Sequence, residues 1–568
     1  MDRETDPLLA PAISPIINDH VDEVDRQEQL KSKSVLSSSR VFAIIFALFT
    51  GSFLSAMDMT LVATLMPTIA SELDASSQMS WIATSYLLSC SAFQPLYGKL
   101  SDIFGRKAML VWSNLVFAFG CFCCGSPWTN DIWTLAAGRF IAGIGGGGLT
   151  ALSTIAVSDI VPLRRRGVYQ GLGNICFSVG CASGSVLGAV FQQSIGWRWA
   201  FLIQVPAAIV SGFLVFTVLK LPSNSPGRGT VFLERDQGNN LNAGQIAAKI
   251  DFKGSFYLVM CMLILMVVIT KVSDVSQLLS SPSFYVSVCA LAVLFPLFVK
   301  AEMATSNPII PLHLLWENRT VLASSLTNWF CTMATFAMMY FVPVFWQSVY
   351  RFDSWNIGIR SISNFAGISI GSLGSGLYMR RTGQYWNFNM VLQSIYVLGI
   401  IIIFSSSFSS KPHGALDYVL MFLPGLGYAS MLTVTLLALI ASVDFQHQAQ
   451  VTSIQYAFRA TGSTLGVSLA GALYQWGLNH KLDRLILKDD ELLERYGSQK
   501  LLRWCSEIVN DNLFDISFDE RLSKLAHKSF MFSSETALAF AVVAALSGLV
   551  CSLFIREHKL LGSVSSSK

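Results

Sequence analysis

The chain has 568 residues, of which 52% are hydrophobic and only 13% are charged, and its formal net charge at pH 7 is +4. A soluble globular chain carries about 25% charged residues, so a soluble domain held by a single anchor is excluded. The small, dispersed net charge argues against nucleic-acid binding. The eleven cysteines show neither metal-ligand nor disulfide spacing, and we expect no metal site, no cofactor and no enzyme active site.

Residues 1–40 form a polar N-terminal segment without the apolar core of a signal peptide. Their polar side chains follow no helical or strand period, which predicts a disordered cytosolic tail. Near its start, the sequence ETDPLL has an acid, three spacers and two leucines. Glu4, Leu8 and Leu9 therefore fit an acidic dileucine signal, which a cytosolic sorting adaptor reads.

Apolar stretches recur through the rest of the chain. A bilayer core about 30 Å thick needs about 20 apolar helical residues, and about fourteen stretches meet this requirement. They predict an all-α membrane protein. The predicted spans lie near 41–66, 80–100, 107–125, 132–158, 168–190, 199–219, 252–270, 283–299, 321–347, 357–379, 387–405, 417–440, 449–477 and 532–555.

Basic residues in the short loops predict the orientation in the membrane. With the N-terminus in the cytosol, the cytosolic loops contain clusters such as 164–166 and 380–381. An even number of helices then places both termini in the cytosol and the polar segment 478–530 on the far side. The short far-side loops hold only isolated basic residues: Arg198, Lys271, Arg351 and Lys411.

A weak internal repeat predicts two similar helix bundles. The sequence GKLSDIFG at 98–105 has an echo, GLYMRRTG, at 376–383, and each follows the second helix of a set of six. Chance similarity of two glycine-rich helix ends is the alternative. The predicted division is a tail at 1–40, a six-helix bundle at 41–220, a cytosolic loop with two inserted helices at 221–300, a second six-helix bundle at 301–556 that includes the far-side loop 478–530, and a cytosolic tail at 557–568.

The segment 98–107, here called the latch motif, places basic side chains beside one carboxylate at a tight glycine turn. Asp102 can accept hydrogen bonds from Arg106 in one conformation and lose them in another. An ordinary basic turn is the alternative, and the full pattern favours a conformational latch. The residues assigned to it are Gly98, Asp102, Gly105, Arg106 and Lys107.

Two ionisable residues are predicted to lie at similar depth in the bilayer. Asp58 lies about 18 residues, or about 27 Å, from the cytosolic end of its span, and Arg139 about 11 Å from the far end. We infer that they form an ion pair. Protonation of Asp58 would break this pair and couple transport to protons, whereas a static structural pair is the alternative. Asp159 is expected to pair locally with the arginines at 164–166.

Arg459 lies about 17 Å deep in its span, near the bilayer midplane. A buried guanidinium can clamp a carboxylate at two points, so Arg459 is our candidate for binding a carboxylate of a ligand. Bonding to backbone carbonyls is the alternative. Asp58 either binds a cationic ligand and the proton in alternation or serves protons alone. Residues expected to add polar or aromatic lining are Gln455, Asn328, Trp329 and Asn174.

The latch motif resembles the signature of the major facilitator superfamily, and further segments resemble its fourteen-helix drug:proton antiporter branch. These segments are 57–67 (MDMTLVATLMP), 81–88 (WIATSYLL), 138–145 (GRFIAGIG) and 197–206 (WRWAFLIQVP). Gly180, Gly184 and Gly188 resemble the branch's antiporter motif, in which small residues let helices approach closely. Ser185 and Ala189 depart from that motif, which makes antiport less secure than membership.

With the dileucine-like signal, the chain is similar to the fungal vacuolar basic amino acid transporters. This resemblance implies a protein of the vacuole membrane that moves lysine, arginine and histidine from the cytosol into the vacuole in exchange for protons. The carboxylate expected at Arg459 is then the α-carboxylate of an amino acid, and neutral amino acids are the alternative cargo if Asp58 serves protons alone. The partners implied are the amino acid, protons, the lipid bilayer and a sorting adaptor, and we expect a monomer. The alternative is a multidrug:proton exporter of the plasma membrane.

Overall fold

The protein is described here by a computed structural model. The predicted sorting signal at Glu4, Leu8 and Leu9 and the end of the C-terminal tail lie outside the described residues and stay predictions. Apart from a few isolated positions between 242 and 308, the structure describes residues 38–73, 80–161, 163–219, 226–236, 251–271, 282–305, 312–352, 354–409, 411–444, 447–486, 489–510 and 519–558.

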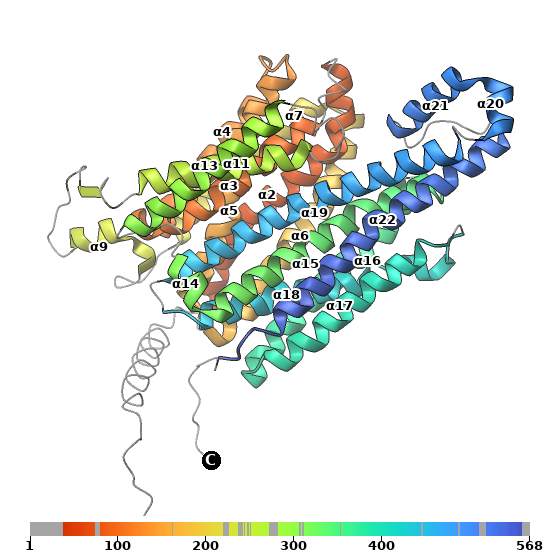
Figure 1. The fold of residues 1–568 in the computed structure, drawn as a ribbon. Helices are drawn as coiled ribbons and strands as arrows, with labels where there is room; N and C mark the ends of the chain where they lie inside the picture. The colour runs from red at the N-terminus through yellow and green to blue at the C-terminus, as the bar shows by residue number, and fades with distance from the viewer. Residues whose placement is uncertain are drawn as a thin grey trace, which may run out of the picture.

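Long helices occupy every apolar stretch that the sequence predicted (Figure 1). The first group is α2 (Ser38–Glu72), α3 (Ser80–Phe104), α4 (Arg106–Gly125), α5 (Ile132–Ile160), α6 (Leu163–Gln193), and α7 (Trp197–Leu202) with α8 (Gln204–Val218). The inserted pair is α11 (Phe252–Lys271) and α13 (Pro282–Ala304). The second group is α15 (Arg319–Ser348), α16 (Ser354–Thr382), α17 (Trp386–Ser406), α18 (Phe422–Ala441), α19 (Gln448–Leu485) and α22 (Glu520–Ser552).

Shorter helices lie in the connections. On the latch motif's side of the molecule, η2 (Pro226–Arg228) and α9 (Thr230–Asp236) follow the first group, and α14 (Leu312–Glu317) precedes α15. At the opposite side are η3 (Gly414–Tyr418), α20 (Asp490–Tyr496) and α21 (Ser498–Asn510). We call these two sides the latch side and the far side.

Ten helices among the described residues are long and apolar enough to cross a membrane by length and composition. Helices α3, α16 and α19 are not among them, and α3 and α19 carry polar side chains that line an internal cavity. Their polarity is accommodated inside the protein, where water and protein groups satisfy it, instead of facing lipid.

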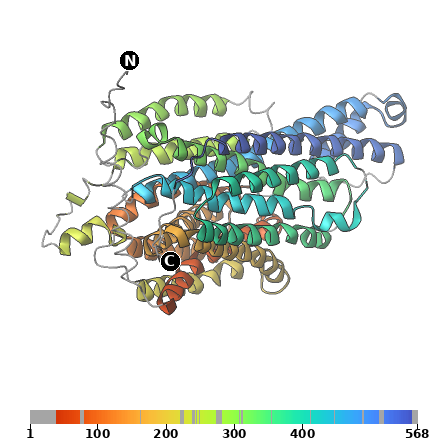
Figure 2. The same ribbon diagram turned by 90° about the horizontal axis from the view of Figure 1, so that it is seen from below.

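Helix packing separates the two groups and shows where they meet. Within the first group α2 packs on α6, and α5 on both α3 and α4; within the second, α15 packs on α19 and α22, and α16 on α18. The groups meet where α6 contacts α16 and α18, and where α19 contacts α3 and α5. Helices α11 and α13 pack on each other, and α11 touches α3 (Figures 1 and 2). The residue limits predicted for the domains stay a prediction.

Segment 478–530 was expected as a polar loop, but its described part is largely helical. Helix α19 continues to Leu485, α22 already begins at Glu520, and α20 and α21 lie between them. Leu492, Leu501 and Ile508 are fully buried in this far-side extension. Apolar residues at helical spacing are sparse enough to leave the segment polar on average, which is why hydropathy alone suggested a loop.

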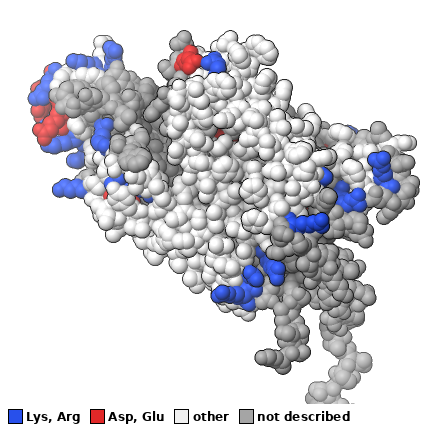
Figure 3. All heavy atoms as spheres, turned by 180° about the vertical axis from the view of Figure 1, so that it is seen from behind, with Lys and Arg blue, Asp and Glu red and all other residues white. Residues whose placement is uncertain are grey.

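On the face shown in Figure 3, the exposed charged side chains gather at the two ends of the molecule. The face shown there has a broad neutral middle, with basic side chains at the latch side and both signs at the α20–α21 end. A neutral girdle between charged ends is what a bilayer requires of a spanning protein.

Candidate transport site

The latch motif forms a buried ionic network at the end of α3. Arg106 Nη1 lies 2.6 Å from Asp102 Oδ1, and Arg106 Nε lies 2.8 Å from Asp159 Oδ2. Gly105 has φ +86°, and a Cβ there would also collide with the carbonyl oxygen of Arg228. One buried guanidinium thus joins the ends of α3 and α5 through two carboxylates.

This network adds a partner that the sequence did not predict. Asp159 was expected to pair with the arginines at 164–166, and the structure shows an ion pair between Asp159 and Arg106; Arg166 donates to the carbonyl oxygen of Val161 and to Gln448, and the Arg164 side chain lies outside the described part of the structure. Arg106 is the first residue of α4 and is only 2% exposed. Its side chain points into the protein, where it meets Asp159 at the end of α5. The remaining latch residue, Lys107, places its Nζ 4.5 Å from the centre of the Phe216 ring.

The two helix groups are held together on the latch side. A Cβ at Gly98 would meet Ser453 of α19, and a Cβ at Gly376 would meet the backbone of Gly167. Arg166 Nη1 donates to Gln448 Oε1 at 2.9 Å across the same boundary. These close approaches shut the latch side in the conformation described.

Asp58 and Arg139 form a sealed ion pair inside the first group. Asp58 Oδ2 lies 2.5 Å from Arg139 Nη1, and their side chains are 0% and 1% exposed. Gln204 Nε2 donates to the other carboxylate oxygen at 3.2 Å, and Arg139 Nε donates to the carbonyl oxygen of Ile82 at 3.2 Å. The sequence predicted this contact because the two residues lie at similar depth in the bilayer, and the structure shows it. The remaining hydrogen bonds to the pair come from α3, through Ile82, and from α8, through Gln204.

Tyr86 of α3 covers this pair. Arg139 Cζ lies 4.4 Å from the centre of the Tyr86 ring, a geometry in which the ring face attracts the cation. The Tyr86 hydroxyl is 2.8 Å from Ser55 Oγ. Both Tyr86 and Ser55 line the internal cavity, so the pair lies behind them and not at the cavity surface.

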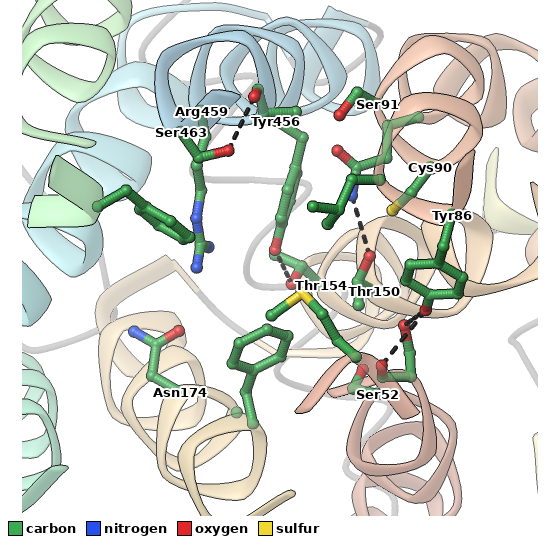
Figure 4. Close-up of a pocket in the computed structure, with 18 of the residues that line it drawn as sticks. Ser52, Tyr86, Cys90, Ser91, Thr150, Thr154, Asn174, Tyr456, Arg459 and Ser463 are labelled. Atoms are coloured by element: carbon green, nitrogen blue, oxygen red, sulfur yellow. Dashed lines mark hydrogen bonds between the residues drawn. The ribbon is translucent and has the colours of Figure 1, made fainter. Parts of the chain in front are cut away.

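The cavity lies between the two groups and has a volume of about 970 Å³, counting the space at its open end. Ligand pockets commonly measure about 300–1,000 Å³. Helices α2, α3, α5 and α6 supply one wall, and α15 and α19 the other (Figure 4). Hydroxyls, amides and aromatic rings dominate its surface, among them Ser52, Gln94, Thr150, Gln170, Asn174, Phe49, Phe177 and Phe336.

Arg459 is the only residue with a full charge among the described residues that line this cavity. It reaches inward from α19, opposite Asn174 of α6 (Figure 4). Its Cζ lies 5.9 Å from the Phe177 ring centre and 6.0 Å from that of Tyr456. Tyr456 in turn bonds Thr154 at 2.7 Å and bridges the two groups.

The predicted lining residues divide into two sets. Gln455 and Asn328 meet Arg459 at a small adjoining cavity of about 250 Å³, and both bond the hydroxyl of Thr435. Trp329 is absent from the described lining of both cavities and packs against Phe330 and Gly462 instead. Asp58 also lines neither cavity, so in this conformation it is out of reach of cargo.

The glycines of α6 lie against α2. A Cβ at Gly180 would come within 2.7 Å of the carbonyl oxygen of Phe53, and one at Gly184 would overlap the backbone of Met57. Gly188 is buried one turn further on. These small residues bring α6 close to the helix that carries Asp58.

Sequence reasoning missed several residues that the structure places at the site. Tyr86 and Gln204 lie in segments that carried the resemblance, yet nothing in their spacing distinguished them from packing residues. Thr150, Thr154 and Gln170 line the cavity as well. Polar residues within otherwise apolar spans were the available signal, because such residues face the protein interior.

The chain is similar to known membrane transporters along most of its length. A model of the Major Facilitator Superfamily matches residues 48–467. The multidrug resistance protein fnx1 of Schizosaccharomyces pombe is 35% identical over 544 residues, covering 95% of this chain and 97% of the relative. Vacuolar basic amino acid transporter 1 of Saccharomyces cerevisiae is 32% identical over 557 residues, covering 92% and 94%.

A solved structure extends the likeness to the fold. The proton:xylose symporter XylE bound to 6-bromo-6-deoxy-D-glucose aligns with a TM-score of 0.54 at 14% identity, covering 92% of this chain and 98% of that chain. The packing of two helix groups around a central cavity agrees with this fold. The chain therefore belongs to the major facilitator superfamily and is a multi-pass membrane transporter of small molecules.

Proposed function

We propose that the protein is a proton-coupled antiporter that moves amino acids, preferably lysine, arginine and histidine, from the cytosol into the vacuole. The observation that carries this proposal is the sealed Asp58–Arg139 pair, which lies one side chain away from a cavity with a single guanidinium. A proton site and a cargo site that are adjacent but separate suit an exchange in which each ligand binds in turn.

The proton site is assigned to Asp58 and Arg139. A buried ion pair is stable only while both partners are charged, because removal of one leaves an uncompensated charge in a medium of low dielectric constant. Protonation of Asp58 would free Arg139 from its partner at 2.5 Å and loosen the contact between α2 and α5. This gives the proton a direct effect on the packing of the first group.

The cargo site is assigned to Arg459, with Gln455 and Asn328 beside it. The guanidinium would bind the α-carboxylate, a match in charge and in planar geometry. A cationic side chain would then extend toward the aromatic rings and hydroxyls of the first group, where Phe49, Ser52 and Ser55 lie. Aromatic faces attract cations without a carboxylate, so basic cargo needs no acid in the cavity.

The location follows from two lines of support. The relative from Saccharomyces cerevisiae is named as vacuolar, and the sorting signal predicted at Glu4, Leu8 and Leu9 is of the kind read by adaptors. The latch side, closed in this conformation, would face the cytosol, and the α20–α21 end would face the lumen. Both termini would then be cytosolic.

Uptake by isolated vacuoles tests the proposal. Vacuoles energised with ATP, from cells with and without the protein, are given labelled lysine, arginine, histidine and a set of neutral amino acids. We expect protein-dependent uptake of the basic amino acids, which a protonophore and Asp58→Asn each abolish. Uptake that survives collapse of the proton gradient would show that transport is not proton-coupled.

A second candidate is export of drugs across the plasma membrane. It is favoured by the aromatic and hydroxyl lining of the cavity and by the similarity to the multidrug resistance protein fnx1. A fluorescent fusion at the cell rim, together with drug sensitivity in cells that lack the protein, would support export over vacuolar uptake.

A further inference from the structure

We propose that Tyr86 is the positioning residue that couples cargo in the cavity to the buried Asp58–Arg139 pair. This inference rests on the proposed function, since it assumes that Asp58 carries the transported proton. It adds a specific element: a single aromatic side chain that belongs to the cavity wall and also covers the proton site.

The contacts of Tyr86 place it between the two sites. Its ring centre lies 4.4 Å from Arg139 Cζ, and its hydroxyl lies 2.8 Å from Ser55 Oγ. Ser55 and Tyr86 are 4% and 2% exposed, and both belong to the cavity lining. Tyr86 and Ser55 therefore form part of the cavity wall, and the ring stands between the cavity and the cation.

The packing around Tyr86 leaves little alternative space. A Cβ at Gly146 of α5 would collide with the Tyr86 hydroxyl and lie 2.9 Å from Ser55 Oγ. Ser55 also donates to the carbonyl oxygen of Gly146 at 3.2 Å. The hydroxyl thus occupies a notch that only glycine permits, and this notch fixes the ring over Arg139.

Among the neighbours of Asp58, Tyr86 is the one whose movement would expose Asp58 to the cavity. Asp58 is bonded by Arg139 from α5 and Gln204 from α8, and the thiols of Cys121 and Cys124 of α4 lie within electrostatic range of it. Of these five neighbours, counting Tyr86, only Tyr86 is among the described residues that line the cavity. Cargo that competes for the hydroxyls of Ser55 and Tyr86 would shift the ring, expose the pair to water and allow Asp58 to be protonated.

Proton leak without cargo is the direct readout. The full-length protein is reconstituted in liposomes that contain a pH-sensitive dye, and a pH gradient is imposed with and without lysine. Because Tyr86→Leu removes the ring from Arg139, we expect a cargo-independent proton flux about thirtyfold above wild type, the equilibrium factor of a desolvated cation–π contact of about 2 kcal/mol. Tyr86→Phe keeps the ring and should leak at about the wild-type rate.

Two further variants test whether the leaking protons reach Asp58 past Tyr86. Tyr86→Leu combined with Asp58→Asn should lose the leak, because the proton-accepting carboxylate is absent. Tyr97→Leu is the matched control. Like Tyr86, Tyr97 is a buried tyrosine of α3, and its hydroxyl donates to the carbonyl oxygen of Ile144 in α5 at 2.7 Å. Unlike Tyr86, it does not line the cavity. We expect no leak from it.

The outcomes separate the inference from the proposed function. If wild-type protein shows no lysine-dependent proton movement, the proposed antiport fails and this inference fails with it. If wild type exchanges lysine for protons but folded Tyr86→Leu does not leak, or leaks equally with Asp58→Asn, only the role of Tyr86 is overturned. Should Tyr86→Leu not fold, Ser55→Ala, which frees the ring from its anchor, must show a smaller leak in the same direction for the inference to stand.

Discussion

The interiors of the two helix groups differ in how they hold charge. In the first group, Arg139 is paired with a carboxylate at 2.5 Å. In the second, Arg459 has neutral neighbours: the phenol rings of Tyr428 and Tyr456, and Gln455 and Asn328 at the adjoining cavity. The first arginine is satisfied within the protein, and the second is turned toward the cavity (Figure 4).

This difference separates two tasks. The Arg139 guanidinium is paired and sealed away from the cavity, whereas the Arg459 guanidinium lies among neutral partners and gains a charge-assisted hydrogen bond when a carboxylate arrives. The first group is therefore suited to proton binding and the second to cargo binding. Changes at Arg139 and Arg459 test that division, and changes at Gly98 and Asp519 test the two ends of the molecule; they follow from the largest expected effect to the smallest.

Removal of Arg139 should have the largest effect. Arg139→Leu leaves Asp58 buried and unpaired, and breaking a buried ion pair from one side costs about 3–5 kcal/mol. We expect a strong fall in thermal stability of the purified protein and no transport. The double variant Asp58→Leu with Arg139→Leu should regain most of the stability and remain inactive. Equal destabilisation by the single and double variants would contradict a coupled pair.

Loss of the Arg459 guanidinium should weaken cargo binding with little change in stability. A hydrogen bond to a charged group contributes about 1.5–3 kcal/mol, or roughly 10- to 100-fold in affinity. We expect Arg459→Ala to raise the KM for lysine by that factor, and Arg459→Lys to recover part of it because the charge is kept and the two-point geometry is lost. An unchanged KM would place the cargo carboxylate elsewhere.

Closure of the latch side depends on Gly98. A Cβ at this position would be 3.0 Å from both the Ala449 carbonyl oxygen and Ser453 Cβ, and would overlap Ser453 Oγ. We expect Gly98→Ala to slow uptake by about tenfold, since overpacking of about 1–3 kcal/mol opposes closure. Ser453→Gly in the same protein should restore part of the rate. The rate of labelled-lysine uptake measures both, and no rescue would mean that this contact is not the obstacle.

The smallest effect is expected at Asp519, which caps α22 at the far side. Backbone donation from Leu522, followed by hydrogen bonds from Tyr496, Arg521 and Arg495, lowers the pKa of Asp519 below its ordinary value of 3.8. A lowered folded-state pKa stabilises the α20–α21 end above about pH 4, and this contribution is lost as the pH falls through the lowered pKa.

Proteolysis of the far-side extension measures this contribution. Asp519→Ala should increase cleavage near α20 and α21 at pH 7, since loss of a helix cap costs about 0.5–2 kcal/mol. Asp519→Asn, which keeps a capping side chain, should show a smaller increase. Cleavage by an acid-active protease should rise below pH 4 in wild type. A rise beginning near pH 6 would point to a different group.

The fold could be predicted because hydrophobicity along one chain is enough to locate spanning helices, and all predicted spans are helices. The Asp58–Arg139 contact could be predicted from depth, because rise per residue fixes position along a helix axis. The direction in which each side chain points around that axis could not be predicted in the same way. Depth alone did not reveal that Asp58 points away from the cavity, that Trp329 lies outside its lining, or that Arg106 reaches Asp159 across to α5.

Simultaneous measurement of proton and lysine fluxes in proteoliposomes tests the central claim most directly. With an acidic interior and labelled lysine outside, we predict lysine uptake accompanied by proton exit, with both fluxes lost together in Asp58→Asn. Lysine uptake without proton movement, or both fluxes unchanged in Asp58→Asn, would contradict the assignment of proton coupling to the first helix group.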